Sequence, residues 1–340
     1  MTGVTVSVLT PTYNRAHVLY RVYESLQRQT VRNFEWVVVD DGSTDGTPDL
    51  LTRWQAEADF PVTWYRYSNN RGKSAAVNSG TKLVSGAYTV ILDSDDAFLD
   101  DAMETIEYFR KESDIDNNDS AYAMVFRYID DHDNLSGRLF YLGKSETNVM
   151  SRLEARYRFE MVCETCIVTK TTVARAEEFV ELTASEHCPE IVTHHRIGKK
   201  FKSVYINHPI GKCFRYDGIE RLTLSSSITW PRGNYLMSLA TLNNDIRYFW
   251  VRPGVFLKAG RSVAMLGFHI RRSPLRQFRD LTNSGARLLW IAGLPRGFAR
   301  YIRDRLHGRR ALKAHPDISA WGPAAPPETP ILRPARQPER

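Results

Sequence analysis

The 340-residue chain carries 46 Lys and Arg against 39 Asp and Glu, a formal net charge of +7, and 42% of its residues are hydrophobic. This composition is ordinary for a soluble globular protein, and no apolar run approaches the roughly 20 residues that a membrane-spanning helix needs. The N-terminus lacks a signal-peptide pattern, and the four cysteines lack metal-site spacing. We therefore expect a cytoplasmic protein with free thiols, and not a secreted or membrane-spanning one.

Strand-like and helix-like segments alternate over the first hundred residues. By β-branched content and apolar runs, the predicted strands are residues 4–10, 34–40, 62–67 and 89–92. The helices predicted between them are residues 16–29, 47–58 and 74–84. This alternation is typical of a mostly parallel sheet with right-handed crossovers, which predicts a Rossmann-like α/β fold flanked by helices.

Polar residues follow each of these predicted strands at the point where it ends. Asp40 and Asp41 can accept hydrogen bonds from a nucleobase N–H or a ribose hydroxyl. Arg71 and Lys73 supply positive charge for a diphosphate. Any one cluster could be a solvated loop, but four successive strand ends with this chemistry favour one ligand site along a common edge of the sheet.

Three carboxylates, Asp93, Asp95 and Asp96, follow the fourth strand. Burying a carboxylate in a core is costly, so we expect these side chains at the carboxyl edge of the sheet. Closely spaced oxygen ligands suit Mg²⁺ or Mn²⁺, especially when phosphate oxygens complete the coordination shell. The alternative is an acidic turn that caps the helix predicted from about residue 100.

Four blocks of sequence, at residues 6–15, 39–47, 70–80 and 93–96, resemble in order and spacing the family 2 glycosyltransferases of the GT-A fold. The resemblance covers roughly the first 100 residues. It implies a metal-dependent, inverting transfer of a sugar from a nucleotide-sugar donor to a hydroxyl acceptor. UDP is the default nucleotide by frequency in the family, and GDP and dTDP remain open.

In that family the nucleotide sugar lies over the strand edge, and the resemblance assigns residues to it. Contacts to the nucleoside are implied for Pro11, Tyr13 and Asp41. Asp93 and Ser94 would lie near the ribose and diphosphate, and Asp95 would bind Mg²⁺ or Mn²⁺. The metal neutralises the diphosphate leaving group, so no protein acid is needed to protonate it.

A block at residues 188–210 resembles the acceptor-side part of one group of these enzymes. By that resemblance Glu190 is the general base that deprotonates the acceptor hydroxyl. Glu186 and Glu164 are the alternatives, and Glu190 could instead be a carboxylate favoured by a helix N-terminus. The residues after Glu190 depart from the group's pattern. We interpret the nearby histidines as acceptor-site or surface residues: His187, His194 and His195.

Farther along the chain the pattern predicts further elements. These are helices at 100–111, 171–179 and 228–244, a strand at 165–169, and a ribbon formed by 121–129 and 138–142 around the turn 130–134. We predict a catalytic domain at 1–227 (nucleotide-sugar half 1–112, acceptor half 113–227), a basic helical extension at 228–314, and a disordered tail at 315–340.

The basic charge is concentrated late in the chain. Residues 245–314 hold 16 Lys and Arg against 3 Asp and Glu, a balance of +13, whereas residues 1–244 balance to about −6. Aromatic and aliphatic residues recur among the basic ones, and a Gly-Pro break interrupts them. This favours short amphipathic helices on an anionic membrane surface. The alternatives are a helical cap on the catalytic domain and nucleic-acid binding, for which no recognised module is visible.

The expected acceptor is a membrane- or lipid-linked saccharide of cell-surface polysaccharide assembly, met at the inner face of the membrane. Two rival functions stay open. A sugar nucleotidyltransferase would carry a glycine-rich loop after the first strand, where this chain has Thr-Pro-Thr-Tyr-Asn-Arg. A non-catalytic sugar-nucleotide-binding scaffold would not need the carboxylates at 93–96. Neither the donor sugar nor the oligomeric state is predicted.

Overall fold

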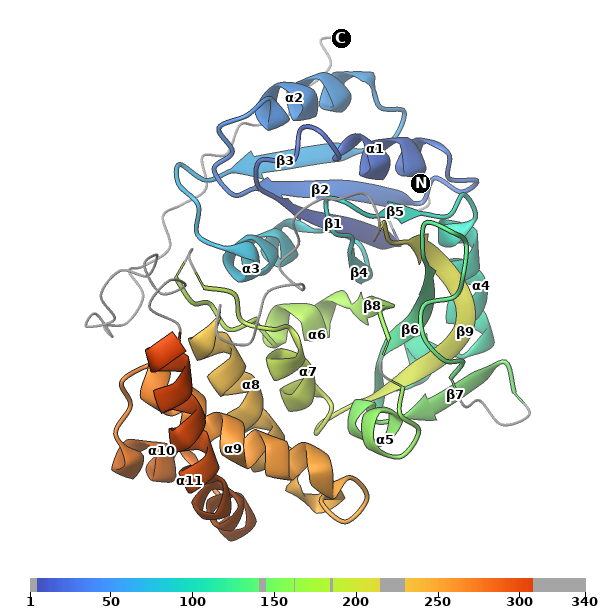
Figure 1. Cartoon of the computed structure of the whole chain (residues 1–340). Coiled ribbons are helices and arrows are strands. Elements are labelled where there is room, and N and C mark those ends of the chain that lie inside the picture. The colour runs from blue at the N-terminus through green and yellow to red at the C-terminus, as the bar shows by residue number, and fades with distance from the viewer. Residues whose placement is uncertain (1–4, 141–144, 162, 184–185, 215–229, 308–340) are drawn as a thin grey trace. The chain divides into compact units, whose positions relative to one another are not determined.

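The computed structural model describes residues 5–140, 145–161, 163–183, 186–214 and 230–307 (Figure 1). Within these limits the chain forms two compact units: residues 5–179 with 200–214, and residues 180–199 with 230–307. Residues 180–199, which the sequence placed in the catalytic domain, therefore group with the C-terminal helices. The tail predicted from residue 315 lies outside the described residues.

The first unit is built on one sheet with the strand order β3-β2-β1-β4-β8-β6-β9-β5, and β7 pairs with β9. Its strands are β1 (Val6–Thr12), β2 (Phe34–Asp40), β3 (Val62–Arg66), β4 (Tyr88–Ile91), β5 (Ala97–Phe98), β6 (Ala121–Ile129), β7 (Thr147–Met150), β8 (Thr165–Lys170) and β9 (Lys202–Lys212). Strands β3, β2, β1 and β4 are parallel, as predicted. Beyond β4 the sheet is mixed: β8 runs antiparallel to β4 and β6, and β9 runs parallel to β6. The expectation of a mostly parallel sheet therefore holds for its N-terminal half.

Helices cover both faces of this sheet (Figure 1). They are α1 (Tyr20–Gln27), α2 (Thr47–Glu57), α3 (Lys73–Leu83), α4 (Ala102–Glu112), α5 (Arg152–Tyr157) and α6 (Thr171–Ala176), with a 3₁₀ turn at Ile115–Asn117. Apolar residues of α1, α2 and α4 pack with Val8, Trp36 and Val38 in the main core. The small residues of α3 pack on the other face, against Leu9 and Val39. The alternating directions of side chains along β1 and β2 thus supply both layers.

The predicted ribbon after β6 is only partly formed. The turn at 130–134 exists, because Asp130 Oδ1 accepts hydrogen bonds from the backbone of His132 and Asn134. The strand predicted at 138–142 is wrong over residues 138–140, and residues 141–142 lie outside the described part. Arg127, fully buried, fixes this segment instead by donating to the carbonyls of Ser136 and Gly137. Side-chain hydrogen bonds from Arg127 on β6, and not the predicted strand pairing, thus hold the residues after the turn.

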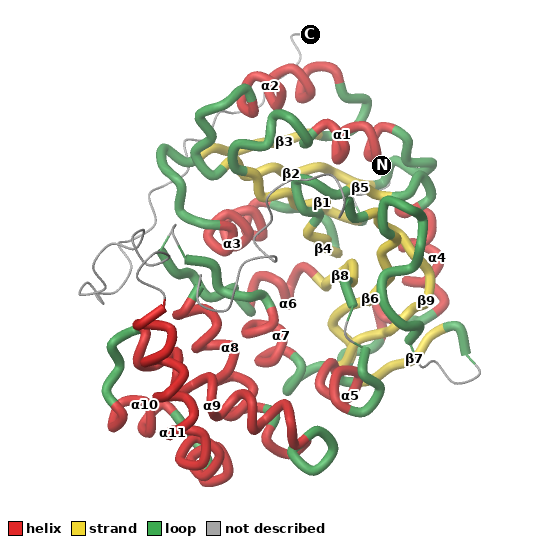
Figure 2. The backbone as a smooth tube through the Cα atoms, in the orientation of Figure 1, coloured by secondary structure: helices red, strands yellow, loops and turns green. Residues whose placement is uncertain are grey.

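The described residues of the second unit are helices and loops, and the yellow strands of Figure 2 belong to the first unit. Its helices are α7 (Ile191–Ile197), α8 (Pro231–Asn244), α9 (Pro253–His269), α10 (Pro274–Asp280) and α11 (Ser284–His307), with a 3₁₀ turn at Ile246–Tyr248. Helix α9 is central and contacts both α8 and α11. Its apolar residues, which the sequence placed on a membrane, form the core of this unit: Phe256, Val263, Ala264 and Leu266 are buried.

Helix α11 continues through Pro295, so the break predicted at this proline is wrong. Two glycines let α11 approach α9 closely. A Cβ at Gly293 would lie 2.6 Å from the backbone nitrogen of Arg261, and one at Gly297 would lie 2.7 Å from Cβ of Ala264. This packing supports the helix on both sides of the proline, where one backbone hydrogen bond is necessarily missing. Among the described residues, no helix combines the length and the apolar character needed to cross a membrane.

Candidate active site

The ends of the first three strands meet at one edge of the sheet. Thr12 at the end of β1 is in register with Asp40 at the end of β2, and Asp40 is in register with Arg66 at the end of β3. Loops carrying the predicted site residues leave from this edge. The ends of parallel strands in an α/β sheet are where ligands are usually bound.

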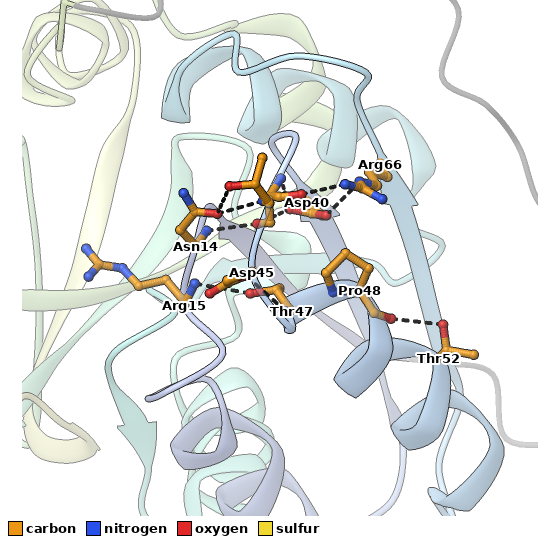
Figure 3. A network of polar contacts seen from close by, with 10 residues as sticks. Asn14, Arg15, Asp40, Asp45, Thr47, Pro48, Thr52 and Arg66 are labelled. Atoms are coloured by element: carbon orange, nitrogen blue, oxygen red, sulfur yellow. Dashed lines mark hydrogen bonds and ion pairs between the residues drawn. The ribbon is translucent and has the colours of Figure 1, made fainter.

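Asp40 is fully buried and holds the loop that follows β2 (Figure 3). Its Oδ1 accepts hydrogen bonds from the backbone N–H and the hydroxyl of Ser43, and its Oδ2 lies 3.3 Å from Nε of Arg66. Burial raises the pKa of Asp40, and the Ser43 bonds and Arg66 oppose that rise. A carboxylate enclosed in this way orders the loop. A contact of Asp40 with a nucleotide stays a prediction.

Asn14, directly after β1, joins the same network. Its backbone has a φ of 53°, its Oδ1 accepts from the N–H of Thr44, and its own N–H donates to the Ser43 hydroxyl. Asparagine tolerates this left-handed conformation better than most residues. The loops after β1 and β2 are consequently tied together by side chain–backbone bonds.

Asp41 ties the loop after β2 to the loop after β3. Its two carboxylate oxygens accept hydrogen bonds from the backbone N–H groups of Arg71 (2.7 Å) and Gly72 (2.8 Å). Gly72 has a φ of 94°, a conformation that side chains rarely adopt, so the loop can aim both N–H groups at one carboxylate. Burial of the Asp41 side chain raises its pKa to about 6, although these two hydrogen bonds favour the charged form.

The cations expected to meet a diphosphate lie on this same loop. The Arg71 guanidinium is 4.8 Å from the ring centroid of Tyr67, whose hydroxyl donates to the carbonyl of Ala75 in α3. Lys73 Nζ lies 2.7 Å from Oδ1 of Asp93. The structure thus brings together Lys73, at the start of α3, and the first of the three carboxylates after β4.

Asp95 lies two residues beyond Asp93 and is half-buried. Its backbone carbonyl accepts a hydrogen bond from Arg21 Nη1 at 3.4 Å, and Arg21 also lies over the ring of Phe214. Ser94, between the two aspartates, is 8% exposed. Burial raises the pKa of Tyr128 well above its ordinary value, and the nearby charges of Asp93 and Asp96 act in the same direction. A neutral tyrosine therefore lies close to these carboxylates.

The donor set at this edge suits a divalent cation that is shared with a phosphate ligand. Among the described residues, no group of three or more His, Cys, Asp or Glu side chains could enclose a metal ion by itself. The edge offers half-buried carboxylates at positions 93 and 95. Mg²⁺ is usually held by one or two carboxylates together with substrate phosphates and water, so these residues fit that mode of binding.

The residues expected beside the nucleoside differ in exposure. Pro11 is buried within β1. Tyr13, just beyond the strand, has 42% of its surface exposed and is available to a ligand. Sequence reasoning missed Arg66, Tyr67 and Arg21, which support the acids and the loop from outside the motifs. The positions of Arg66 and Tyr67 at the end of β3 could have suggested these two, whereas Arg21 lies within α1 and carries no such signal.

The candidate bases lie in different surroundings. Glu190 is half-buried at the N-cap of α7, in the second unit, and its carbonyl accepts from the N–H groups of Thr193 and His194. Glu186 lies 3.3 Å from Nε of Arg232, and both side chains are almost completely buried, which indicates a structural ion pair. Glu164 is exposed, just before β8 in the first unit.

The histidines were expected in the acceptor site or at the surface, and the surface alternative is wrong for two of them. His194 and His195 are buried, and His195 Nδ1 lies 3.0 Å from Oδ2 of the equally buried Asp245. His187 is half-buried, with its ring edge-on to Trp230. The segment that departs from the family's usual pattern is therefore part of the core of the second unit.

Comparison with known proteins gives several matches. Residues 7–165 match the family model described as glycosyl transferase family 2. An uncharacterized glycosyltransferase of Rickettsia felis is 35% identical over 120 residues, which are 35% of this chain and 19% of that protein. The putative teichuronic acid biosynthesis glycosyltransferase TuaG of Bacillus subtilis is 31% identical over 120 residues, 35% of this chain and 47% of that protein. The chain thus spans less than half the length of these relatives.

A crystal structure of S. aureus TarS residues 1–349 in complex with UDP-GlcNAc matches with a TM-score of 0.60. The match covers 89% of this chain and 92% of that one at 17% sequence identity. At this identity the likeness concerns the fold alone, and it confirms the predicted GT-A fold with its C-terminal helices.

Proposed function

We propose that this chain, whose residues 7–165 match the family model described as glycosyl transferase family 2, transfers a sugar from a nucleotide-sugar donor to a hydroxyl acceptor with inversion. One observation carries this proposal. Four sequence blocks meet at one strand edge, where Asp41 holds the Arg71–Gly72 backbone and Lys73 meets Asp93. A UDP-sugar is the favoured donor, since TarS, which shares the fold, is described in complex with UDP-GlcNAc.

In this proposal the residues of the edge have separate tasks. Tyr13, exposed beyond β1, contacts the nucleoside with Pro11 beneath it. Asp40 and Asp41 position the two loops, and Asp41 keeps oxygen lone pairs that a nucleoside N–H or hydroxyl can use. Arg71 and Lys73 attract the diphosphate, and Lys73 exchanges its contact with Asp93 for a phosphate oxygen when donor binds.

Asp95 would hold Mg²⁺ or Mn²⁺ together with the donor's phosphate oxygens, and Asp93 and Ser94 would lie near the ribose and diphosphate. When bound, such an ion neutralises the charge of the diphosphate leaving group. The chain's own contribution is to hold these carboxylates close to Lys73, one of the cations that attract the donor's phosphates.

Glu190 is the proposed general base, which removes the proton of the acceptor hydroxyl as that oxygen attacks the sugar. The ion pair with Arg232 gives Glu186 a structural task, which leaves Glu190 as the better candidate in this segment. An inverting displacement requires one such base, on the face of the sugar opposite the leaving group. The transferred group in this proposal is a hexosyl group.

The acceptor that we propose is a membrane- or lipid-linked saccharide of cell-surface polysaccharide assembly. Two features support it: the basic segment at 245–314, and the likeness to a putative teichuronic acid biosynthesis glycosyltransferase. The protein would then act in the cytoplasm, peripherally at the inner face of the membrane. The domain division at 227 and 314 remains part of this proposal.

Titration calorimetry of the full chain with UDP, GDP and dTDP, with and without Mn²⁺, tests the proposed donor site. We expect one nucleotide to bind more tightly with Mn²⁺, and Asp95→Ala to remove that metal effect. Asp119→Ala replaces an exposed carboxylate of the same unit and serves as the control. No binding of any nucleotide would contradict the proposal, as would an unchanged metal effect in Asp95→Ala.

A further inference from the structure

Helix α11 has two different apolar faces. One face packs within the second unit through buried or half-buried residues: Ala286, Trp290, Gly293, Gly297, Tyr301 and Asp304. These positions recur at intervals of three or four, as expected for one side of a helix. Packing of this face on α9 accounts for the stability of the helix, and it leaves the opposite side to be explained.

The opposite face is exposed, and it is apolar along the whole helix. Its large residues are Leu288, Ile291, Phe298, Ile302 and Leu306. Leu288 and Leu306, near the two ends, are 66% and 73% exposed. With 3.6 residues per turn, these five positions and Pro295 fall on one stripe on the side of the helix away from the buried face. Phe298, at the edge of the stripe, also contacts Phe268 of α9. Single exposed apolar residues are common on soluble proteins, but a stripe of this length indicates a binding surface.

Arginines border this stripe on both sides. By the same helical geometry, Arg287 and Arg305 lie along one edge, and Arg296 and Arg303 lie on the other side of the stripe. The single acid of the helix, Asp304, lies on the buried face. Its oxygens lie 3.0 Å from Nε of Arg300 and 3.5 Å from Nε2 of His269 in α9. No carboxylate of α11 therefore lies on the exposed stripe or its borders.

We propose that this outer face of α11 lies flat in the interface of an anionic lipid bilayer. The apolar stripe would enter the boundary between headgroups and acyl chains, and the arginines on its two edges would contact anionic headgroups. The proposal deepens the membrane part of the proposed function. The membrane-binding surface, first assigned to the whole basic segment at 245–314, is thereby limited to one face of α11, because the apolar side of α9 is buried inside the unit.

Charge decides between a lipid surface and a second copy of this chain. Two copies that paired through this face about a twofold axis would bring arginine borders against arginine borders. Like charges placed opposite each other oppose such contact, whereas anionic headgroups neutralise both borders at once. The occupant that fits both the apolar stripe and its borders is therefore an anionic membrane.

Co-sedimentation of the full-length protein with phosphatidylcholine vesicles, with and without phosphatidylglycerol, tests this proposal. We expect binding to the anionic vesicles that weakens in high salt, because exposed charges are screened. Arg296→Gln with Arg305→Gln, one from each border, should lower the partition coefficient roughly 30-fold, the effect of two arginine–leaflet attractions. Arg53→Gln with Lys111→Gln, both exposed in the first unit, is the charge-matched control and should bind like the parent protein.

The apolar stripe is tested separately by Leu288→Gln, Ile291→Gln and Leu306→Gln together. These side chains are more than half exposed, so circular dichroism and melting should be unchanged, while vesicle binding should fall at least about tenfold. Leu275→Gln, at an exposed leucine of α10, is the matched control. Truncation at Asn244 is unsuitable, because it would remove α9 from the core of the unit.

Each of these vesicle results would overturn the proposal: no binding to anionic vesicles, equal binding to neutral and anionic vesicles, or stripe and border variants that bind like the parent. Sedimentation velocity without vesicles tests whether the face instead binds a second copy of the chain. If the parent protein is a dimer and the stripe variant is a monomer, the proposal is also overturned. The vesicle assay contains no nucleotide or sugar. Its failure would leave the proposed sugar transfer standing, and failure of nucleotide binding would leave the vesicle result intact.

Discussion

The buried carboxylate of Asp41 makes a testable contribution to the pH dependence of stability. In the folded protein its pKa is about 6, against an ordinary value of 3.8. The folded state therefore binds this proton more tightly than the unfolded state. Stability contributed by this group falls as pH rises from about 4 to about 6, and does not change above that range. A difference of roughly two pKa units corresponds to about 3 kcal/mol.

Asp41→Asn removes the titration, so comparing the two proteins isolates it. Urea unfolding, followed by tryptophan fluorescence between pH 4 and pH 7, gives the free energy of unfolding of each. Trp36 and Trp54, buried in the core of the first unit, report on that unit. We expect the value for the parent minus that for Asp41→Asn to fall by about 3 kcal/mol across this range. The pKa of Asp40 is also raised, so its contribution to stability has the same sign and is present in both proteins.

For Asp45→Asn, the stability difference from the parent should change with pH in the opposite direction. The pKa of Asp45 is lowered, because hydrogen bonds from Thr47 and Ala16 outweigh the effect of burial. The parent should therefore lose stability relative to Asp45→Asn as the pH falls through this lowered pKa. A difference between parent and Asp41→Asn that is constant, or that rises with pH, would refute the reasoning about Asp41.

The same substitution should weaken the proposed donor site. An asparagine amide offers one oxygen where the carboxylate offers two, so an N–H of Arg71 or Gly72 would face another N–H group. A buried donor left without a partner costs about 1–3 kcal/mol. We therefore expect nucleotide affinity to fall by about 5- to 150-fold at pH 7, measured by titration calorimetry. Unchanged affinity would show that the loop does not depend on Asp41.

Three further predictions concern other parts of the chain. Asp95→Ala should keep the melting temperature, because the residue lies at a strand edge, and should abolish most sugar transfer; near-normal activity would disprove the metal assignment. Glu190→Gln should lower turnover roughly 10²–10⁴-fold while donor affinity holds. If Glu164→Gln shows that loss instead, the base has been misassigned. Gly297→Ala should destabilise the second unit by about 1–3 kcal/mol in urea unfolding, because the new Cβ would lie 2.8 Å from the carbonyl oxygen of Arg261.

The N-terminal half of the fold was predictable because each strand and helix there carries its own local signal. Strands β2 and β6 have the predicted ends, and the polar strand ends meet where parallel topology requires. The second half of the sheet was not predictable as mixed, since pairing between distant strands leaves no local pattern. The segment after β6 was not predictable for a related reason: hydrogen bonds from buried Arg127 to the carbonyls of Ser136 and Gly137, and not strand pairing, hold it.

The site was predictable by residue type but not by the task of each residue. Asp40 and Asp41 are adjacent acids in the sequence, yet one is bonded to its own turn and the other to the loop after β3. The helical packing of α9 was missed for a similar reason. Its apolar residues suit a membrane or a protein core equally well, and only the partner helices distinguish the two.

Product mass from a donor screen tests the central claim most directly. The full-length protein would be incubated with UDP-, GDP- and dTDP-sugars, Mn²⁺ and a lipid-linked saccharide extract, and Asp95→Ala would be run alongside. The proposed function predicts one donor whose sugar mass appears on an extracted saccharide only with the parent protein, together with release of the nucleoside diphosphate. Release of pyrophosphate would indicate nucleotidyl transfer. The absence of any added sugar across the whole panel would contradict sugar transfer.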